Sequence, residues 1–169
     1  VKKGKHLLDE FYSVYSINMR DLGTPTHSKK FFRKIIEYFN DIDIIVIYYG
    51  KKPIASMFLF FYKDVVADLW ASSINRYNKY CPNNLMYWDV IKTGSMDGYK
   101  YFDMGRSSIS SGTHNFKKQW NPGILPLSYL TSDSNVDKRI LKLLFVWTWK
   151  KLPIIFSRIL GPKLRVYIP

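Results

Sequence analysis

Cysteine and histidine are scarce in this chain. Cys81 is the only cysteine among 169 residues, which excludes an intrachain disulfide and any zinc site built from several cysteines. The three histidines are scattered, and neither an HExxH pattern nor a His-x-His spacing occurs, so no metal site is predicted. A lone cysteine far from any histidine favours a packed side chain over a nucleophile. It also favours a reducing compartment, so we expect a cytoplasmic location.

Long apolar runs and acidic residues are also few. No stretch of about 18 apolar residues occurs, which argues against a membrane-spanning helix. The opening residues VKKGK lack the apolar core of a signal peptide, so none is expected. The chain has 13 Asp and Glu against 26 Lys and Arg, a net charge of +13. That charge favours anionic partners such as nucleic acid, phospholipid headgroups or nucleotide-linked substrates.

A length of 169 residues suits one domain with a core of its own. The spacing of the apolar residues changes along the chain between that of helices and that of strands. Helical spacing predicts helices at 8–22, 28–39, 82–96, a short one ending at 120, and one after 135 that Pro153 breaks. Runs of β-branched and aromatic residues predict strands at 42–49, 54–62, 65–72, 99–103 and 124–130. Residues 154–160 are predicted as a short apolar turn. The fold class is therefore α/β, with a mixed sheet in residues 1–135 and a helical tail, 136–169, packed on it.

The stretch from Tyr99 to Gly123 is the strongest candidate for a functional site. It predicts a half-buried strand that runs into a Gly/Ser turn and then into a short basic helix. Ligands bind preferentially where strands of α/β sheets end, and two charged residues of opposite sign stand there, Asp103 and Arg106. Together with Arg106, the turn and helix offer Ser107, Phe116, Lys118 and Trp120 as candidates for substrate binding, and Lys117 as a candidate for catalysis. An equally supported interpretation is structural, namely a strand, a capped helix and a packed aromatic pair.

The order of the elements resembles the GNAT acyltransferase fold without its opening strand. Four strings sharpen the resemblance: NMRDLGTPTHSKKFF, PNNLMYW, FDMGRSSISSGT and FKKQW. Together, in this order, they are similar to FemAB-like acyltransferases, particularly those that accompany exopolysaccharide and PEP-CTERM sorting systems. The matches run from about Phe11 to Pro162. Proteins of that family contain two GNAT-like halves, and this chain resembles the second half, so an N-terminal half is an expected partner.

The resemblance implies transfer of an acyl or aminoacyl group to an amine of a cell-envelope precursor, in peptidoglycan or exopolysaccharide synthesis. In the better-known members the donor is aminoacyl-tRNA. By position, Asp103 and Arg106 match the family's strand-end pair, and Phe116, Lys117 and Trp120 match the helix motif, whose lysine is placed to stabilise developing charge. The chain departs from the family pattern at two positions. Asn121 stands where glycine is common, and His114 stands where an aromatic residue is usual.

Acyl transfer to an amine passes through a tetrahedral oxyanion, which a fixed cation can stabilise. Lys117 is the first candidate for that role. The proton of the amine could go to Asp103, to His114 or to solvent. An Asp103–Arg106 salt bridge would make Asp103 a weaker base.

No resident cofactor is expected, because the acyl donor is a co-substrate. The Arg/Gln-x-x-Gly-x-Gly/Ala loop that cradles the CoA pyrophosphate in GNAT enzymes is missing from the sequence. Aminoacyl-tRNA is therefore favoured over acyl-CoA as the donor, and it suits the net charge of +13.

Two further interpretations stay open. The chain could be a non-catalytic basic module that binds tRNA, lipid-linked saccharide or membrane on behalf of an N-terminal half. Residues 136–169 carry eight basic residues and one acidic residue, so this tail could lie on an acidic membrane at its inner face. Packing of the tail over the sheet is favoured over that membrane contact.

Overall fold

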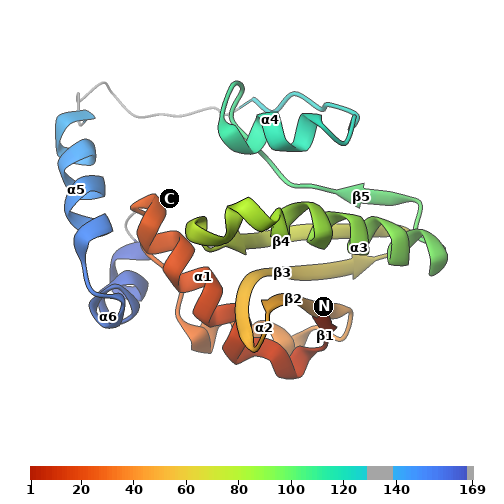
Figure 1. Ribbon diagram of the computed structural model, residues 1–169, viewed down its shortest axis with the longest axis horizontal. Helices are drawn as coiled ribbons and strands as arrows, with labels where there is room; N and C mark the ends of the chain where they lie inside the picture. The colour runs from red at the N-terminus through yellow and green to blue at the C-terminus, as the bar shows by residue number, and fades with distance from the viewer. Residues whose placement is uncertain (129–138, 167–169) are drawn as a thin grey trace.

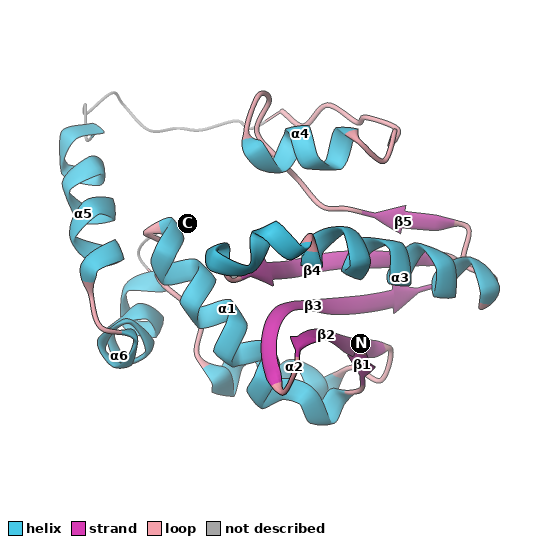
Figure 2. Ribbon diagram, in the orientation of Figure 1, coloured by secondary structure: helices cyan, strands magenta, loops and turns pink. Residues whose placement is uncertain are grey.

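The computed structural model describes residues 1–128 and 139–166, and it shows a mixed β-sheet with helices on both faces (Figures 1 and 2). The strands follow one another across the sheet in chain order, β1-β2-β3-β4-β5. Their bounds are β1 Lys2–Lys3, β2 Ile42–Tyr49, β3 Lys52–Tyr62, β4 Val65–Ser73 and β5 Tyr101–Asp103. Neighbours pair antiparallel except β4 and β5, which run parallel. This confirms the predicted GNAT-like class with a mostly antiparallel sheet.

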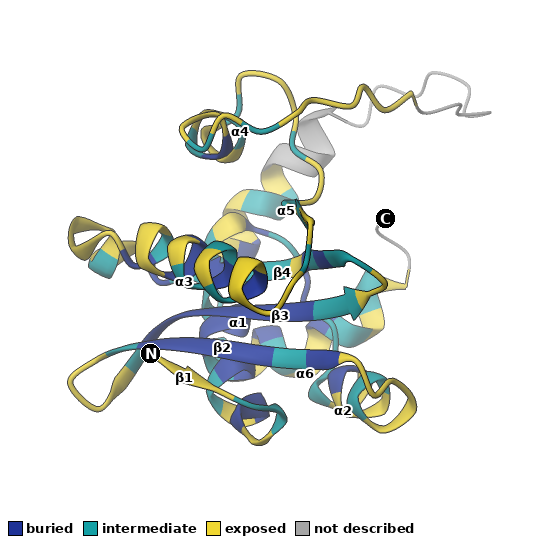
Figure 3. Cartoon of the chain, turned by 90° about the vertical axis from the view of Figure 1, so that its right-hand side faces the viewer, coloured by how far each residue is buried: buried dark blue, intermediate teal, exposed yellow. Residues whose placement is uncertain are grey.

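Helices cover both faces of the sheet, so the long central strands are buried (Figure 3). The helix bounds are α1 Leu8–Leu22, α2 Lys29–Tyr38, α3 Pro82–Met96, α4 Gly112–Lys118, α5 Arg139–Lys151 and α6 Ile154–Arg165, with short 3₁₀ turns at Lys5–Leu7 and Asn75–Tyr80. Side chains that alternate along β2 and β3 enter two separate cores. One core lies under α1 and α2 around Phe11, Phe32 and Phe58, and the other lies under α3 around Met57 and Met86.

Local chemistry explains where the first helices begin and end. The Ser28 hydroxyl accepts a hydrogen bond of 3.0 Å from the Phe31 amide and caps α2. Gly23 ends α1 in the left-handed conformation, at φ 79°, which glycine adopts without strain. Pro82 occupies the first turn of α3, where its missing N–H costs nothing. These features were readable from the sequence, and the predicted helices are confirmed.

Three predictions about elements were wrong. An opening strand is present, because Lys2–Lys3 pairs with Val46 and Ile45, but two residues are too short to show a period. Residues 124–128 form no strand, and Pro126, which has no amide proton to donate, lies among them. The rest of that predicted strand lies outside the described residues. Residues 154–160 are helical and continue as α6 through Gly161 and Pro162.

The tail helices lie along α1 rather than over the sheet, and Figure 1 shows them on the far side of α1 from the strands. Gly161 stands where α6 comes closest to the segment after α1. A Cβ atom at this position would lie 2.5 Å from Thr26 Oγ1 and 2.8 Å from the Thr26 amide nitrogen. The glycine is thus a point of close contact between α6 and the segment after α1. No helix within the described parts of the chain is long and apolar enough to cross a membrane.

Gly161→Ala is expected to destabilise the protein by about 1–3 kcal/mol, because the new methyl group must displace the Thr26 backbone. Alanine normally stabilises a helix relative to glycine. A loss of stability in this variant would therefore come from the contact with Thr26 alone. Urea unfolding measures the difference. Gly112→Ala on α4 is the matched control, since Gly112 is also helical and a Cβ there meets nothing within 4 Å. A gain in stability for Gly161→Ala would disprove the close packing of α6.

Candidate functional site

The candidate site lies where β5 parts from β4. The two strands pair over three residue pairs only, Val65 with Tyr101, Val66 with Phe102, and Ala67 with Asp103. β5 then ends, whereas β4 continues to Ser73. A register shift in the β3–β4 pairing accompanies the divergence, since Phe58 pairs with Trp70 and Leu59 with Asp68. Beyond Ala67, this edge of β4 therefore offers backbone groups to a ligand rather than to a strand.

A buried carboxyl group stands directly at the divergence. Asp68 is 6% exposed, and its Oδ2 atom accepts a hydrogen bond of 2.7 Å from the Tyr87 hydroxyl. Its Oδ1 atom has no hydrogen-bond partner among the described residues. Tyr87 comes from α3, so the bond ties the helix to the strand. An unsatisfied buried carboxyl oxygen is costly, and such groups cluster at functional sites.

Burial raises the pKa of Asp68 from its ordinary 3.8 to about 6, against the lowering effects of the Tyr87 hydrogen bond and the Lys117 charge. The nearby Asp103 carboxylate raises it further. Burial lowers the pKa of Lys117, while Asp68 and Asp103 act in the opposite direction. The pKa of Tyr87 is raised, first by burial and then by Asp68. Asp68 is therefore a carboxylate at neutral pH that takes up a proton readily.

The raised pKa of Asp68 predicts how stability depends on pH. Between 3.8 and about 6, the folded chain keeps a proton that the unfolded chain releases, so the free energy of unfolding falls as the pH rises through this window. The full effect is about 3 kcal/mol. Asp68→Asn cannot ionise, so its stability relative to wild type should rise between about pH 4 and pH 6 in urea unfolding. The exposed Asp97→Asn should follow wild type, and a pH-independent difference for Asp68→Asn would contradict the raised pKa.

Lys117 lies near Asp68 and holds the turn after β5 in place through hydrogen bonds. Its side chain is buried, at 8% exposure, and its Nζ atom donates to the carbonyl oxygens of Gly105 and Arg106, each at 3.1 Å. Gly105 has φ 66°, and a Cβ there would lie 3.1 Å from the Asp68 carbonyl oxygen. The ammonium group has three protons, so one remains beyond these two bonds. The lysine singled out from the sequence thus lies at the divergence of the two strands.

The other predicted residues surround this point at different depths. Asp103 is exposed, and its carboxylate accepts a hydrogen bond of 2.7 Å from the Gly105 amide, which fixes the turn. Ser107 and His114 are half-buried, and Arg106 and Lys118 are exposed. The His114 amide donates to the Ser111 hydroxyl, which caps α4.

Phe116 and Trp120 form an aromatic wall with Tyr87, as the structural interpretation of the pair predicted. The ring of Tyr87 packs edge-on to Phe116 at 5.0 Å and stacks with Trp120 at 6.3 Å. The indole Nε1 of Trp120 is buried and has no partner among the described residues. These two ring contacts and the two hydrogen bonds of Lys117 hold the short helix over the site, because seven residues cannot form a stable helix alone.

Neither Asp68 nor Tyr87 was predicted from the sequence as a site residue. Asp68 is a lone acidic residue within the otherwise apolar and small strand VVADLWASS, and that was the available signal. Its partner lies 19 residues further along the chain, on a helix whose apolar residues all looked like core. Within the described residues, no three His, Cys, Asp or Glu side chains gather where they could hold a metal ion.

Comparisons with known proteins address the fold and the family of the chain. A structure of an aminoglycoside acetyltransferase from an uncultured soil metagenomic sample, in complex with sisomicin, matches with a TM-score of 0.62 and 6% identity, over 79% of this chain and 95% of that one. The ribosomal-protein-alanine N-acetyltransferase from Brucella melitensis biovar Abortus 2308 matches with a TM-score of 0.56 and 8% identity, over 79% and 100%. At such identities the likeness is one of fold. No curated protein sequence matches significantly. Residues 1–118 match the family model of the acetyltransferase (GNAT) domain, and the chain belongs to that family.

Proposed function

We propose that the chain is an N-acyltransferase domain of the FemAB-like type, which transfers an acyl or aminoacyl group to an amine of a cell-envelope precursor. The observation that carries the proposal is the divergence of β4 and β5 beside the buried pair of Asp68 and Tyr87. The family supports acyl transfer, and the four sequence strings favour the FemAB-like substrate class.

The residues at the divergence suit the two demands of the reaction. The amine nitrogen attacks the acyl carbonyl carbon and loses a proton, and the bond to the donor oxygen breaks as that oxygen takes up a proton. Asp68 accepts the proton of the amine through Oδ1, which has no other described partner. Lys117 stabilises the oxyanion with its remaining N–H, from a position held by Gly105 and Arg106.

The remaining predicted residues keep supporting roles in this proposal. Asp103, at the end of β5, and His114, on α4, are the alternative proton acceptors. Ser107 supplies a hydroxyl group for an anionic donor. Lys118 and the guanidinium group of Arg106 supply positive charge. Phe116 and Trp120 form an aromatic wall with Tyr87 beside the divergence.

Aminoacyl-tRNA is the proposed donor. The connection between β4 and α3, residues 74–81, contains no glycine and is mostly a 3₁₀ turn. It therefore lacks the flexible backbone of a loop that wraps a pyrophosphate. A net charge of +13 suits a large polyanion held through many weak phosphate contacts.

A thermal-shift panel with aminoacyl-tRNA, acetyl-CoA, UDP-sugars and peptidoglycan precursors tests the choice of donor and acceptor, because a ligand of the folded state raises its apparent stability. We expect shifts with aminoacyl-tRNA and an envelope precursor. A shift with acetyl-CoA alone would instead indicate an ordinary small-molecule acetyltransferase. Binding of tRNA without any transfer would favour a non-catalytic basic module that serves an N-terminal half.

A further inference from the structure

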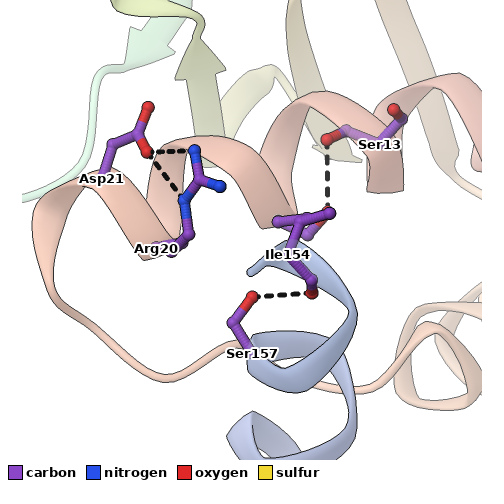
Figure 4. Close-up of polar contacts among 6 residues, drawn as sticks. Ser13, Arg20, Asp21, Ile154 and Ser157 are labelled. Carbon is purple, nitrogen blue, oxygen red and sulfur yellow. Dashed lines mark hydrogen bonds and ion pairs between the residues drawn. The ribbon is translucent and has the colours of Figure 1, made fainter. Parts of the chain in front are cut away.

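Helix α6 turns its polar side inward. Ser157 and Gly161 are buried against α1 and the segment after it, and the Thr26 hydroxyl donates to the Ser157 carbonyl oxygen. Figure 4 shows the Ser157 hydroxyl bonded back to the Ile154 carbonyl on the side of α6 that faces α1. One residue further on, Arg158 donates from Nε to the Ser16 hydroxyl at 2.9 Å. Small and polar residues thus form the most buried part of the contact between α6 and the rest of the protein.

The outer side of α6 is apolar instead. Ile155, Phe156, Ile159 and Leu160 are between 40% and 65% exposed. Ile155 and Ile159 are four residues apart, as are Phe156 and Leu160, so the four side chains lie together on one side of the helix. A helix that only covers a globular domain buries its apolar side and shows its polar side to water, and α6 does the reverse. A contiguous apolar surface of this kind marks a site of contact with a membrane or a partner.

Helix α5, which precedes α6, also exposes apolar side chains. Trp149 is buried, whereas Leu144 and Trp147 are 56% and 59% exposed. Lys151 lies one turn beyond Trp147, with its Nζ atom 3.5 Å from the centre of the indole ring. An exposed tryptophan beside a lysine is typical of the boundary between lipid and water.

The charge of these helices decides which partner fits. Residues 138–169 contain eight Lys and Arg and no Asp or Glu. A second copy of the chain would bring an equally positive surface against this one, which is unfavourable. An anionic bilayer offers both an apolar layer for the isoleucines and negative headgroups for the lysines.

We propose that α5 and α6 form an interfacial membrane-docking surface, in which the outer side of α6 enters an anionic bilayer. Ile155, Phe156 and Ile159 lie at the headgroup boundary, and Lys150, Lys151 and Lys163 contact the anionic headgroups. This surface is separate from the β4–β5 divergence, so its test does not depend on acyl transfer.

Vesicle co-sedimentation of the full 169-residue chain tests the proposal. Phosphatidylcholine vesicles with about 30 mol% phosphatidylglycerol should bind the chain at about 0.1 M salt, with weaker binding at about 0.5 M, and pure phosphatidylcholine should bind much less. Ile155→Glu combined with Ile159→Glu should lower binding to the anionic vesicles by at least about tenfold. Both side chains are more than half exposed, so the fold should survive, which the thermal midpoint checks.

The matched control changes the charge equally at a distance from the tail. Tyr38 and Tyr62 are 77% and 69% exposed on α2 and β3, so Tyr38→Glu combined with Tyr62→Glu alters the net charge without touching α6. We expect this control to keep most of the binding. Failure of the wild-type chain to bind anionic vesicles would overturn the proposal and assign the apolar side of α6 to a protein partner. Equal loss in both double variants would also overturn it, because charge alone would then explain the binding.

Discussion

Asp68→Asn is expected to lower the rate of acyl transfer by about a hundredfold or more, the usual contribution of a positioned proton acceptor. Asparagine has nearly the same shape as aspartate and can still accept the hydrogen bond from Tyr87, so the link between β4 and α3 should persist. What disappears is the ability to take a proton at Oδ1. The loss should therefore fall on turnover and leave donor binding almost unchanged.

The pH profile separates this role from a structural one. Since the pKa of Asp68 is about 6, kcat/KM of the wild-type chain should fall as the pH drops below that value and the carboxylate becomes protonated. The residual activity of Asp68→Asn should lack this acidic limb. Asp103→Asn should keep it, because Asp103 is exposed and already accepts the Gly105 amide. If the limb vanished in Asp103→Asn and survived in Asp68→Asn, the two carboxylates would have to exchange roles.

Lys117→Ala is expected to have the second large effect, with turnover reduced by about 10²–10³-fold, as when one oxyanion donor is removed. The same change deletes two charged hydrogen bonds to the turn after β5, so the free energy of unfolding should also fall, by about 2 kcal/mol. Single-turnover rates on enzyme shown to be folded at the assay temperature distinguish the two losses.

Lys118→Ala provides the matched control for Lys117→Ala. The two lysines are adjacent on α4, but Lys118 is exposed whereas Lys117 is buried. The Lys118 variant should keep its stability and its turnover, and lose only some affinity for a polyanionic donor. Full turnover in folded Lys117→Ala would show that this lysine holds the turn without taking part in chemistry.

Most of the fold was predictable because its elements carry strong periods of their own. The helix stripe that ends at Gly23, the cap at Ser28 and the meander of β2, β3 and β4 are properties of short stretches of sequence. The errors lie where contacts between distant segments decide. β1 is a strand because it pairs with β2, and α6, which includes Gly161, packs closely at that glycine against Thr26, more than 130 residues away in the sequence.

The residues of the candidate site also fall into those that a local motif predicts and those that depend on contacts between distant segments. Lys117 was identified because the motif around it is local, and the structure places it beside the end of β5. Asp68 and Tyr87 could not be paired from the sequence, since their hydrogen bond links a strand to a helix. The pKa of Asp68 depends on burial by elements from the whole domain, which no stretch of sequence displays. The outward apolar side of α6 depends equally on how that helix docks on α1.

The most direct test of the site is to map donor binding by amide NMR on the uniformly labelled chain. The probes are the aminoacyl-adenosine end of an aminoacyl-tRNA and, for comparison, acetyl-CoA. If the donor enters the divergence, the largest saturable shifts will fall on residues 69–73 of β4 and on Gly105, while α5 and α6 stay unchanged. Saturable binding with shifts confined to any other surface would contradict a transfer site between β4 and β5.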